Sequence, residues 1–345
     1  MTQCSGIIYA YRIAAEGAAE SLLPIVLGSD GVPTSGQQLD AASNTRINEC
    51  LASPELCWVH LDINEPSSRQ WAEAELSFLD PLIIDALFAE ETRPRILEFD
   101  NGALLIMRGV NLNTDAEPED MVSIRLWVDG SRIISVRKRR LKAVTDLRER
   151  LEVGLGPRSA GDFLTQLAAR LFERMEPVFS ELDERLDDAE EKVMEEADAR
   201  FRSKITEIRK QAIVFRRYIA PQRDVIAALR ISDMSWLNEI HKRRLQESLD
   251  RVIRYIEDID TIRERAQIVK DELSNALSDK MNKNLYMLSV IAAVFLPLGF
   301  LTGLLGINVG GLPGVDDPNA FWIFSGILMA VVVAQIALFK RWKWF

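Results

Sequence analysis

The chain has little cysteine and histidine, and this scarcity limits its chemistry. Its three cysteines, Cys4, Cys50 and Cys57, form no Cys-x-x-Cys pair, and it has only two histidines. An odd set of cysteines without a paired framework is typical of a reducing cytosolic compartment. If residues 57 to 63 form a strand, Cys57 and His60 face opposite sides and cannot share a metal ion. The sequence therefore predicts no structural zinc site.

The sequence also lacks the short motifs that carry common enzyme chemistry. It contains no Gly-rich phosphate loop, no G-x-S-x-G nucleophile elbow and no H-E-x-x-H metalloprotease motif. Its first residues do not show a basic region followed by an apolar core, so we expect no secretory signal. We therefore expect a protein that is not an enzyme, requires no cofactor and keeps its N-terminal part in the cytoplasm.

Positive charge is in shorter supply than negative charge. The formal net charge is −10, and because residues 281 to 345 carry +2, the first 280 residues hold −12. This balance argues against a nucleic-acid partner, since binding phosphates requires a basic face. An acidic surface would instead serve solubility or attract cations.

Two segments near the C-terminus lack charged side chains altogether. They comprise residues 285 to 306 and residues 321 to 339. At ~1.5 Å of rise per residue, each is long enough to cross most of a hydrocarbon core of ~30 Å. We expect two transmembrane helices in a lipid bilayer. Pro297 in the first is tolerable there because neighbouring groups can satisfy the carbonyl that it frees, and Gly299 leaves room for close packing.

The charges that flank these segments predict their orientation. Basic residues lie before the first segment and after the second, at Lys280, Lys283, Lys340, Arg341 and Lys343. Because basic residues favour the cytoplasmic side, we expect both chain termini in the cytoplasm and residues 340 to 345 as a cytoplasmic tail. The connecting loop, residues 307 to 320, carries Asp316 and Asp317 without Lys or Arg and is expected outside.

Residues 1 to 158 alternate between short β-rich runs and helical stretches. Strands are predicted at residues 6 to 13, 57 to 63, 95 to 100, 103 to 110, 121 to 129 and 132 to 138. Asp129 and Gly130 between the last two indicate a hairpin. Helices are expected at residues 66 to 77 and 81 to 89, each with proline in its first turn. The pattern predicts an α+β cytoplasmic domain.

Residues 159 to 284 are expected to be helical and to lead into the membrane. Apolar residues at steps of three and four predict one long helix over residues 164 to 197. A second helix, 200 to 220, should end before Pro221, and a third should run from Trp236 into the first apolar segment. Residues 181 to 198 hold ten carboxylates, which form either a solvated helix face or a cation-collecting surface.

Two membrane helices cannot enclose a water-filled path, so a transport function requires several copies of the chain. Without transport, the hairpin would only anchor a coiled-coil scaffold. The polar side chains on or just after the first segment, Ser289, Thr302 and Asn308, are all neutral. Amide and hydroxyl oxygens suit an ion that keeps its water shell better than a bare divalent cation.

Three motifs resemble a known family in their expected order. They are "ETRPR" (91 to 95), "RRYIAPQRDV" (216 to 225) and "FLPLGFLTGLLGINVGGLPG" (295 to 314). With the helical hairpin, they resemble the CorA superfamily of divalent-cation transporters and are similar to its zinc-transporting ZntB branch. Most of that superfamily has Gly-Met-Asn where this chain has Gly306, Ile307 and Asn308.

The resemblance implies a homopentameric funnel in a bacterial inner membrane. It implies that Asn308 meets the arriving hydrated ion and that one face of the first membrane helix lines the pore, through Asn282, Leu285, Leu288, Ala292, Leu296, Gly299 and Thr302. The ZntB branch implies Zn²⁺ as the transported ion, with Cd²⁺, Ni²⁺ and Co²⁺ as further candidates and protons as a coupling ion. Isoleucine at position 307 in place of methionine argues against Mg²⁺ selectivity without proving Zn²⁺. Because nothing in the residues themselves rejects Mg²⁺, a Mg²⁺/Co²⁺ channel of the CorA type is the alternative.

Overall fold

The structure is a computed structural model that describes residues 6–28, 33–34, 39–90, 92–307, 314 and 317–341. The chain divides into two compact units. The first unit comprises Met1–Glu195 and Arg200–Lys270, and the second comprises Glu196–Ala199 and Asp271–Phe345. Each unit is described by itself below.

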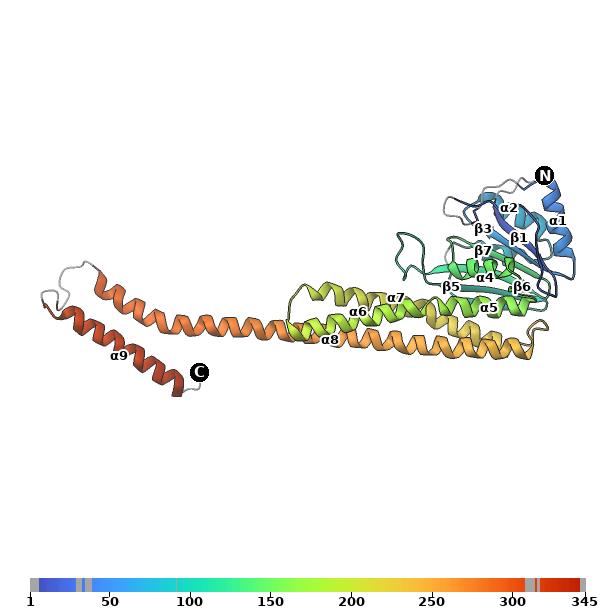
Figure 1. The fold of residues 1–345 in the computed structure, drawn as a ribbon. Coiled ribbons are helices and arrows are strands. Elements are labelled where there is room, and N and C mark those ends of the chain that lie inside the picture. Colours follow the sequence, from blue (N-terminus) through green and yellow to red (C-terminus); the bar gives the residue numbers. More distant parts are fainter. Residues whose placement is uncertain are drawn as a thin grey trace. The chain divides into compact units, whose positions relative to one another are not determined.

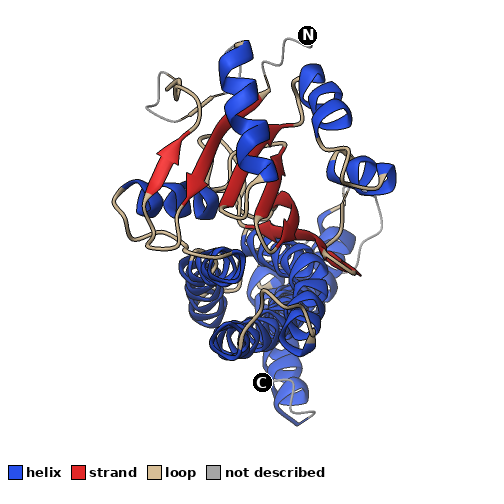
Figure 2. Cartoon of the chain, turned by 90° about the vertical axis from the view of Figure 1, so that its right-hand side faces the viewer, coloured by secondary structure: helices blue, strands red, loops and turns tan. Residues whose placement is uncertain are grey.

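A seven-stranded sheet organises the first unit, in the order β2-β1-β3-β7-β6-β5-β4. Strands β3 and β7 pair in parallel and all other neighbours are antiparallel. Helices lie on both faces of the sheet (Figure 2). The strands are β1 (Ile7–Ile13), β2 (Ala19–Ser21), β3 (Leu56–Asp62), β4 (Arg95–Phe99), β5 (Gly102–Gly109), β6 (Val122–Asp129) and β7 (Arg132–Arg137).

The six predicted strands are all present, and β6 and β7 form the hairpin expected at Asp129 and Gly130. The two predicted helices are α2 (Pro66–Glu75) and α3 (Pro81–Leu87). The prediction missed β2 and two helices, α1 (Ala41–Ala52) and α4 (Lys142–Glu152). The start of α1 carried a readable signal, because the Asp40 side chain caps it by accepting a hydrogen bond from the Ser43 N–H at 2.7 Å.

Strand β3 separates its side chains between two environments, as its alternation predicts. Cys57, Val59 and Leu61 lie in the main apolar core. On the other face, the His60 ring stacks on Tyr9 with centroids 4.8 Å apart, and its Nδ1 lies 2.7 Å from the Ser135 Oγ. The prediction that Cys57 and His60 face opposite sides is confirmed.

The buried His60 predicts that the protein loses stability in mild acid. Burial, and then the nearby Arg137, hold the pKa of His60 well below its usual value. Below a pH of ~6.5 the unfolded chain therefore takes up a proton that the folded chain refuses, which costs at most ~1.4 kcal/mol per pH unit. Melting temperatures between pH 8 and 5 should fall more steeply for the wild type than for His60→Gln. Equal slopes would contradict this role.

The helical part of the first unit differs from the prediction at residue 174. Instead of one helix over residues 164 to 197, the chain forms α5 (Ala160–Glu173) and α6 (Glu176–Glu195) (Figure 1). The reason is Pro177, the second residue of α6. Proline has no N–H to donate and disfavours helical geometry in the residue before it, so it is accepted in a first turn but not in a helix interior.

The predicted end of a helix before Pro221 is wrong, because α7 (Phe201–Ile231) continues through it. The proline removes the hydrogen bond to the carbonyl of Arg217, which lies on the exposed side of the helix, where water can replace the donor. Ile219 and Ile226, one on each side of the proline, are fully buried. Their burial keeps both halves of α7 packed and offsets a cost of ~3 kcal/mol for an interior proline.

Two helices are long and apolar enough to cross a membrane, as predicted. They are α8 (Glu239–Gly306), whose apolar part is its C-terminal end, and α9 (Ala320–Arg341). The predicted third helix, expected from Trp236, corresponds to α8 and begins at Glu239. It continues without interruption through Pro297.

Candidate functional site

The predicted pore-lining residues all lie on the C-terminal part of α8. Successive residues of an α-helix turn by ~100°, so the seven positions fall within roughly half of the circumference, with Asn282 at its edge. All seven are exposed in the single chain. The exposed fraction is 54% for Leu285, 63% for Leu288 and 73% for Leu296. In a bilayer such an apolar face can contact lipid, pack against further copies of the chain or line an aqueous path.

Helix α9 packs on the other half of the α8 circumference. The less exposed residues of the apolar part of α8 are Val290, Ala293, Val294, Pro297, Leu298 and Leu301. The side chain of Gln335 in α9 reaches this side and donates a hydrogen bond to the Ala293 carbonyl at 3.5 Å. The chain's own second helix therefore leaves the predicted pore-lining face uncovered.

The outer end of α8 is partly described. The helix ends at Gly306, and Ile307 follows it with 48% of its surface exposed. The predicted ion-contacting residue, Asn308, and the loop residue Asp316 lie outside the described residues. Asp317 is exposed and its carboxylate accepts the Asn319 N–H at 2.9 Å, which shapes the turn before α9.

Glycine leaves open space along the exposed half of α8. A methyl group added at Gly299 or Gly303 would meet no atom of the described chain within 4 Å. These glycines form a G-x-x-x-G pair, the spacing that lets membrane helices approach closely. The spacing therefore favours helix-to-helix contact on the same side as the predicted pore-lining residues.

The acidic face of α6 forms ion pairs with an arginine side chain in the first unit. The Arg265 guanidinium of α8 contacts the carboxylates of Asp183, Asp187 and Glu190 at 3.1, 2.6 and 2.6 Å. The hydrogen bond to Asp187, and then that to Glu190, raise the pKa of Arg265. A cation that binds to these three carboxylates of α6 would therefore have to compete with the Arg265 guanidinium.

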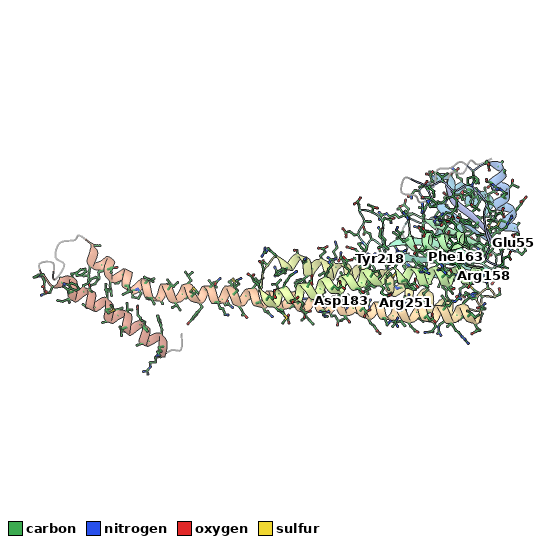
Figure 3. The ribbon with its side chains drawn as sticks, in the orientation of Figure 1. Glu55, Arg158, Phe163, Asp183, Tyr218 and Arg251 are labelled. Carbon is green, nitrogen blue, oxygen red and sulfur yellow. The ribbon has the colours of Figure 1, made fainter. Side chains whose placement is uncertain are left out.

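A polar groove of about 500 Å³ runs between α6 and α8 and is lined by both signs of charge, including Asp183 and Arg251 (Figure 3). Among the residues that the structure describes, no group of three or more His, Cys, Asp or Glu side chains is placed to hold a metal ion.

Arg108 is a structural residue that the sequence analysis missed. Its guanidinium donates from Nε and Nη2 to the Thr92 carbonyl and from Nη1 to the Met121 carbonyl, at 2.7 to 3.1 Å. It also lies over the Tyr218 ring, 4.2 Å from the centroid, and its backbone N–H donates to the Gln222 side chain at 2.5 Å. Two motifs that carried the resemblance, "ETRPR" and "RRYIAPQRDV", therefore meet at Arg108. An arginine within an otherwise apolar strand was the available signal.

These features define an integral membrane protein with an α+β unit, a long helix and a C-terminal pair of transmembrane helices. A family model described as "CorA-like Mg2+ transporter protein" matches residues 53–341. The chain belongs to the CorA family of divalent cation transporters and is not an enzyme.

Individual relatives agree with this assignment. The chain is 40% identical over 298 residues to the "Divalent cation transporter CmaX" of Pseudomonas aeruginosa, covering 85% of this chain and 89% of the relative. It is 33% identical over 342 residues to the "Zinc transport protein ZntB" of Yersinia enterocolitica, covering 99% and 97%. The solved structure of the full-length CmaX protein covers 99% of both chains, with a TM-score of 0.79 and 35% identity.

Proposed function

We propose that the protein is a homopentameric transporter that passes hydrated or partly hydrated Zn²⁺ across a bacterial inner membrane. Ions would travel along the exposed face of α8, from a ring formed by one Asn308 per subunit at the outer mouth to Asn282 at the inner end. Both chain termini would lie in the cytoplasm. Cd²⁺, Ni²⁺ and Co²⁺ are further candidate ions, and protons are the candidate coupling ion.

The observation that carries this proposal is the uncovered face of α8. Close helix-to-helix packing at the Gly299–Gly303 pair requires a second helix on this face, and a path for ions must be shielded from lipid. Leu288 and Leu296 are exposed in one chain, and α9 packs on the opposite half of the helix. An assembly of several copies around this face resolves both requirements, whereas an anchor for a scaffold needs neither.

Zn²⁺ as the transported ion is supported by the relative that matches the larger share of the chain. Transport of Mg²⁺ or Co²⁺ is the second candidate. The zinc-transport relative matches nearly the whole chain, while the more identical relative is described only as a transporter of divalent cations. Ile307 in place of the usual methionine favours an ion other than Mg²⁺. The neutral polar groups near the outer mouth suit any hydrated divalent cation, so ion identity must be measured.

A flux assay tests the proposed function. Purified protein in sealed liposomes should take up Zn²⁺ faster than Mg²⁺, and an inward proton gradient should accelerate Zn²⁺ uptake if protons are coupled. Asn308→Ala should reduce flux about tenfold, because it removes the amide oxygens that hold the ion's water shell. Asn308→Gln, which keeps the amide, is the matched variant.

The outcomes separate the alternatives. Faster Mg²⁺ flux that ignores the proton gradient would identify the channel alternative. Absence of flux for every ion, with the assembly intact by light scattering, would overturn transport and restore the scaffold interpretation.

A further inference from the structure

Proline creates a specific defect in the membrane part of α8. An α-helix closes each turn with a hydrogen bond from the N–H of residue i to the carbonyl of residue i−4, and proline has no N–H. Pro297 therefore leaves the carbonyl of Ala293 without its helical donor. In a hydrocarbon environment an unpaired carbonyl is costly, because water is not available to replace the donor.

Helix α9 supplies a donor at that carbonyl. The Nε2 of Gln335 lies 3.5 Å from the Ala293 oxygen and donates to it. Gln335 is the only strongly polar residue among residues 321 to 339. The strongly polar side chain of this uncharged stretch of α9 is thus placed at the carbonyl that Pro297 frees.

The Gln335 side chain leaves one of its own polar atoms unpaired, and this energetic cost indicates that Gln335 is more than a packing residue. Its amide Oε1 is enclosed and has no hydrogen-bond partner among the described residues. An unpaired amide oxygen in an apolar region is unfavourable, and leucine or methionine at this position would avoid the cost. The donor half of the amide must therefore contribute something that an apolar side chain cannot.

Helix α8 changes direction toward its C-terminal end, and Pro297 is the proline inside this helix. Figure 1 shows the last turns of α8 inclined to the stretch before them. Bends of this kind form at proline, where the ladder of hydrogen bonds is interrupted. Leu296, on the predicted pore-lining face, is next to Pro297 in sequence, so the angle of the bend moves this side chain relative to the pore axis.

We propose that Gln335 is a positioning residue for transport: by holding the carbonyl freed by Pro297, it fixes the bend of α8 and thereby the width of the pore at Leu296. The inference rests on the proposed function, because it takes the exposed face of α8 as the ion path. Gln335 itself does not contact the ion. It acts through the backbone of the pore-lining helix from the opposite side.

A double-mutant cycle tests the proposal. Gln335→Met keeps the side-chain length and removes the donor, and Pro297→Ala returns an N–H to the Ala293 carbonyl. In the wild-type background Gln335→Met should lower the maximal flux about threefold, the usual weight of an interhelical hydrogen bond in a membrane. The cation concentration that gives half-maximal flux should stay unchanged, since no ion contact is lost.

The decisive comparison is the same replacement in the Pro297→Ala background. There the carbonyl has its helical donor, so Gln335→Met should change flux by less than ~1.5-fold. An equal loss in both backgrounds would overturn the proposal. If Pro297→Ala does not assemble, Pro297→Leu restores the same N–H. Leu328→Met, a volume-conserving change two turns earlier on the same half-buried side of α9, is the control and should leave flux unchanged.

Thermal unfolding of the purified assembly separates this proposal from the proposed function. The melting temperatures of the four proteins of the cycle should show the same non-additivity, and this measurement needs no transported ion. Absence of flux in the wild type together with non-additive melting would overturn the transport pathway and leave the Gln335 contact standing. Additive melting temperatures would overturn the contact, whatever the flux.

Discussion

Labelling a cysteine at position 296 with a charged thiol reagent is expected to block cation flux almost completely. Leu296 has 73% of its surface exposed and belongs to the half of α8 that α9 does not cover. If this half lines the pore, Leu296→Cys places one thiol per subunit in the ion path. A permanent positive charge on each would repel a divalent cation in a narrow region of low dielectric constant, and we expect a flux reduction of about a hundredfold.

The matched variant for this experiment is Val294→Cys. Position 294 is two residues away along the same helix but lies among the half-buried residues on the α9 side. The reagent should reach it slowly and leave the flux within about twofold of the unlabelled protein. The native Cys50 and Cys57 are buried in the first unit. Wild-type protein, which carries no introduced cysteine, is treated with the same reagent to measure any contribution from the native thiols. Equal block at positions 294 and 296 would refute the assignment of the pore-lining face.

The sequence was most informative where a single local pattern decides the structure. The absence of charge over residues 285 to 306 and 321 to 339 was sufficient to locate the apolar helices, and alternation located six strands. Proline was misread at two positions. The prediction ran one helix through Pro177, which lies in the first turn of α6, and ended a helix before Pro221, which lies inside α7. The difference is tertiary, since Ile219 and Ile226 are buried on either side of Pro221, and no local pattern contains that information.

The candidate site shows the same division between local and distant information. The resemblance named the predicted pore-lining residues, and their spacing along α8 then places them on one half of the helix. The contact between Gln335 and the Ala293 carbonyl was not accessible in this way, because 42 residues separate the two. The sequence showed an isolated glutamine and an isolated proline, and only the packing of α9 on α8 relates them.

Replacing Arg108 by methionine is expected to destabilise the first unit strongly while leaving its apolar core intact. The replacement preserves much of the side-chain length but removes donors from the Thr92 and Met121 carbonyls. Hydrogen bonds from a charged group contribute ~1.5–3 kcal/mol each, and an orphaned buried acceptor adds to the loss. We expect a loss of ~3 kcal/mol, which corresponds to a fall in melting temperature of roughly 6–12 °C.

Two further variants test whether the loss comes from the hydrogen bonds of Arg108. Arg108→Lys retains the charge but cannot reach both carbonyls with a planar fork, so it should recover only part of the loss. Arg223→Met removes an exposed arginine of α7 whose ion pair with Asp224 lies on the surface, and it should cost less than ~1 kcal/mol. Equal melting temperatures for Arg108→Met and Arg223→Met would show that Arg108 does not join the two motifs. A large fall confined to Arg108→Met would instead explain why "ETRPR" and "RRYIAPQRDV" occur together in one chain: the loop at Thr92 and the helix that carries Tyr218 are held to the sheet by the same side chain.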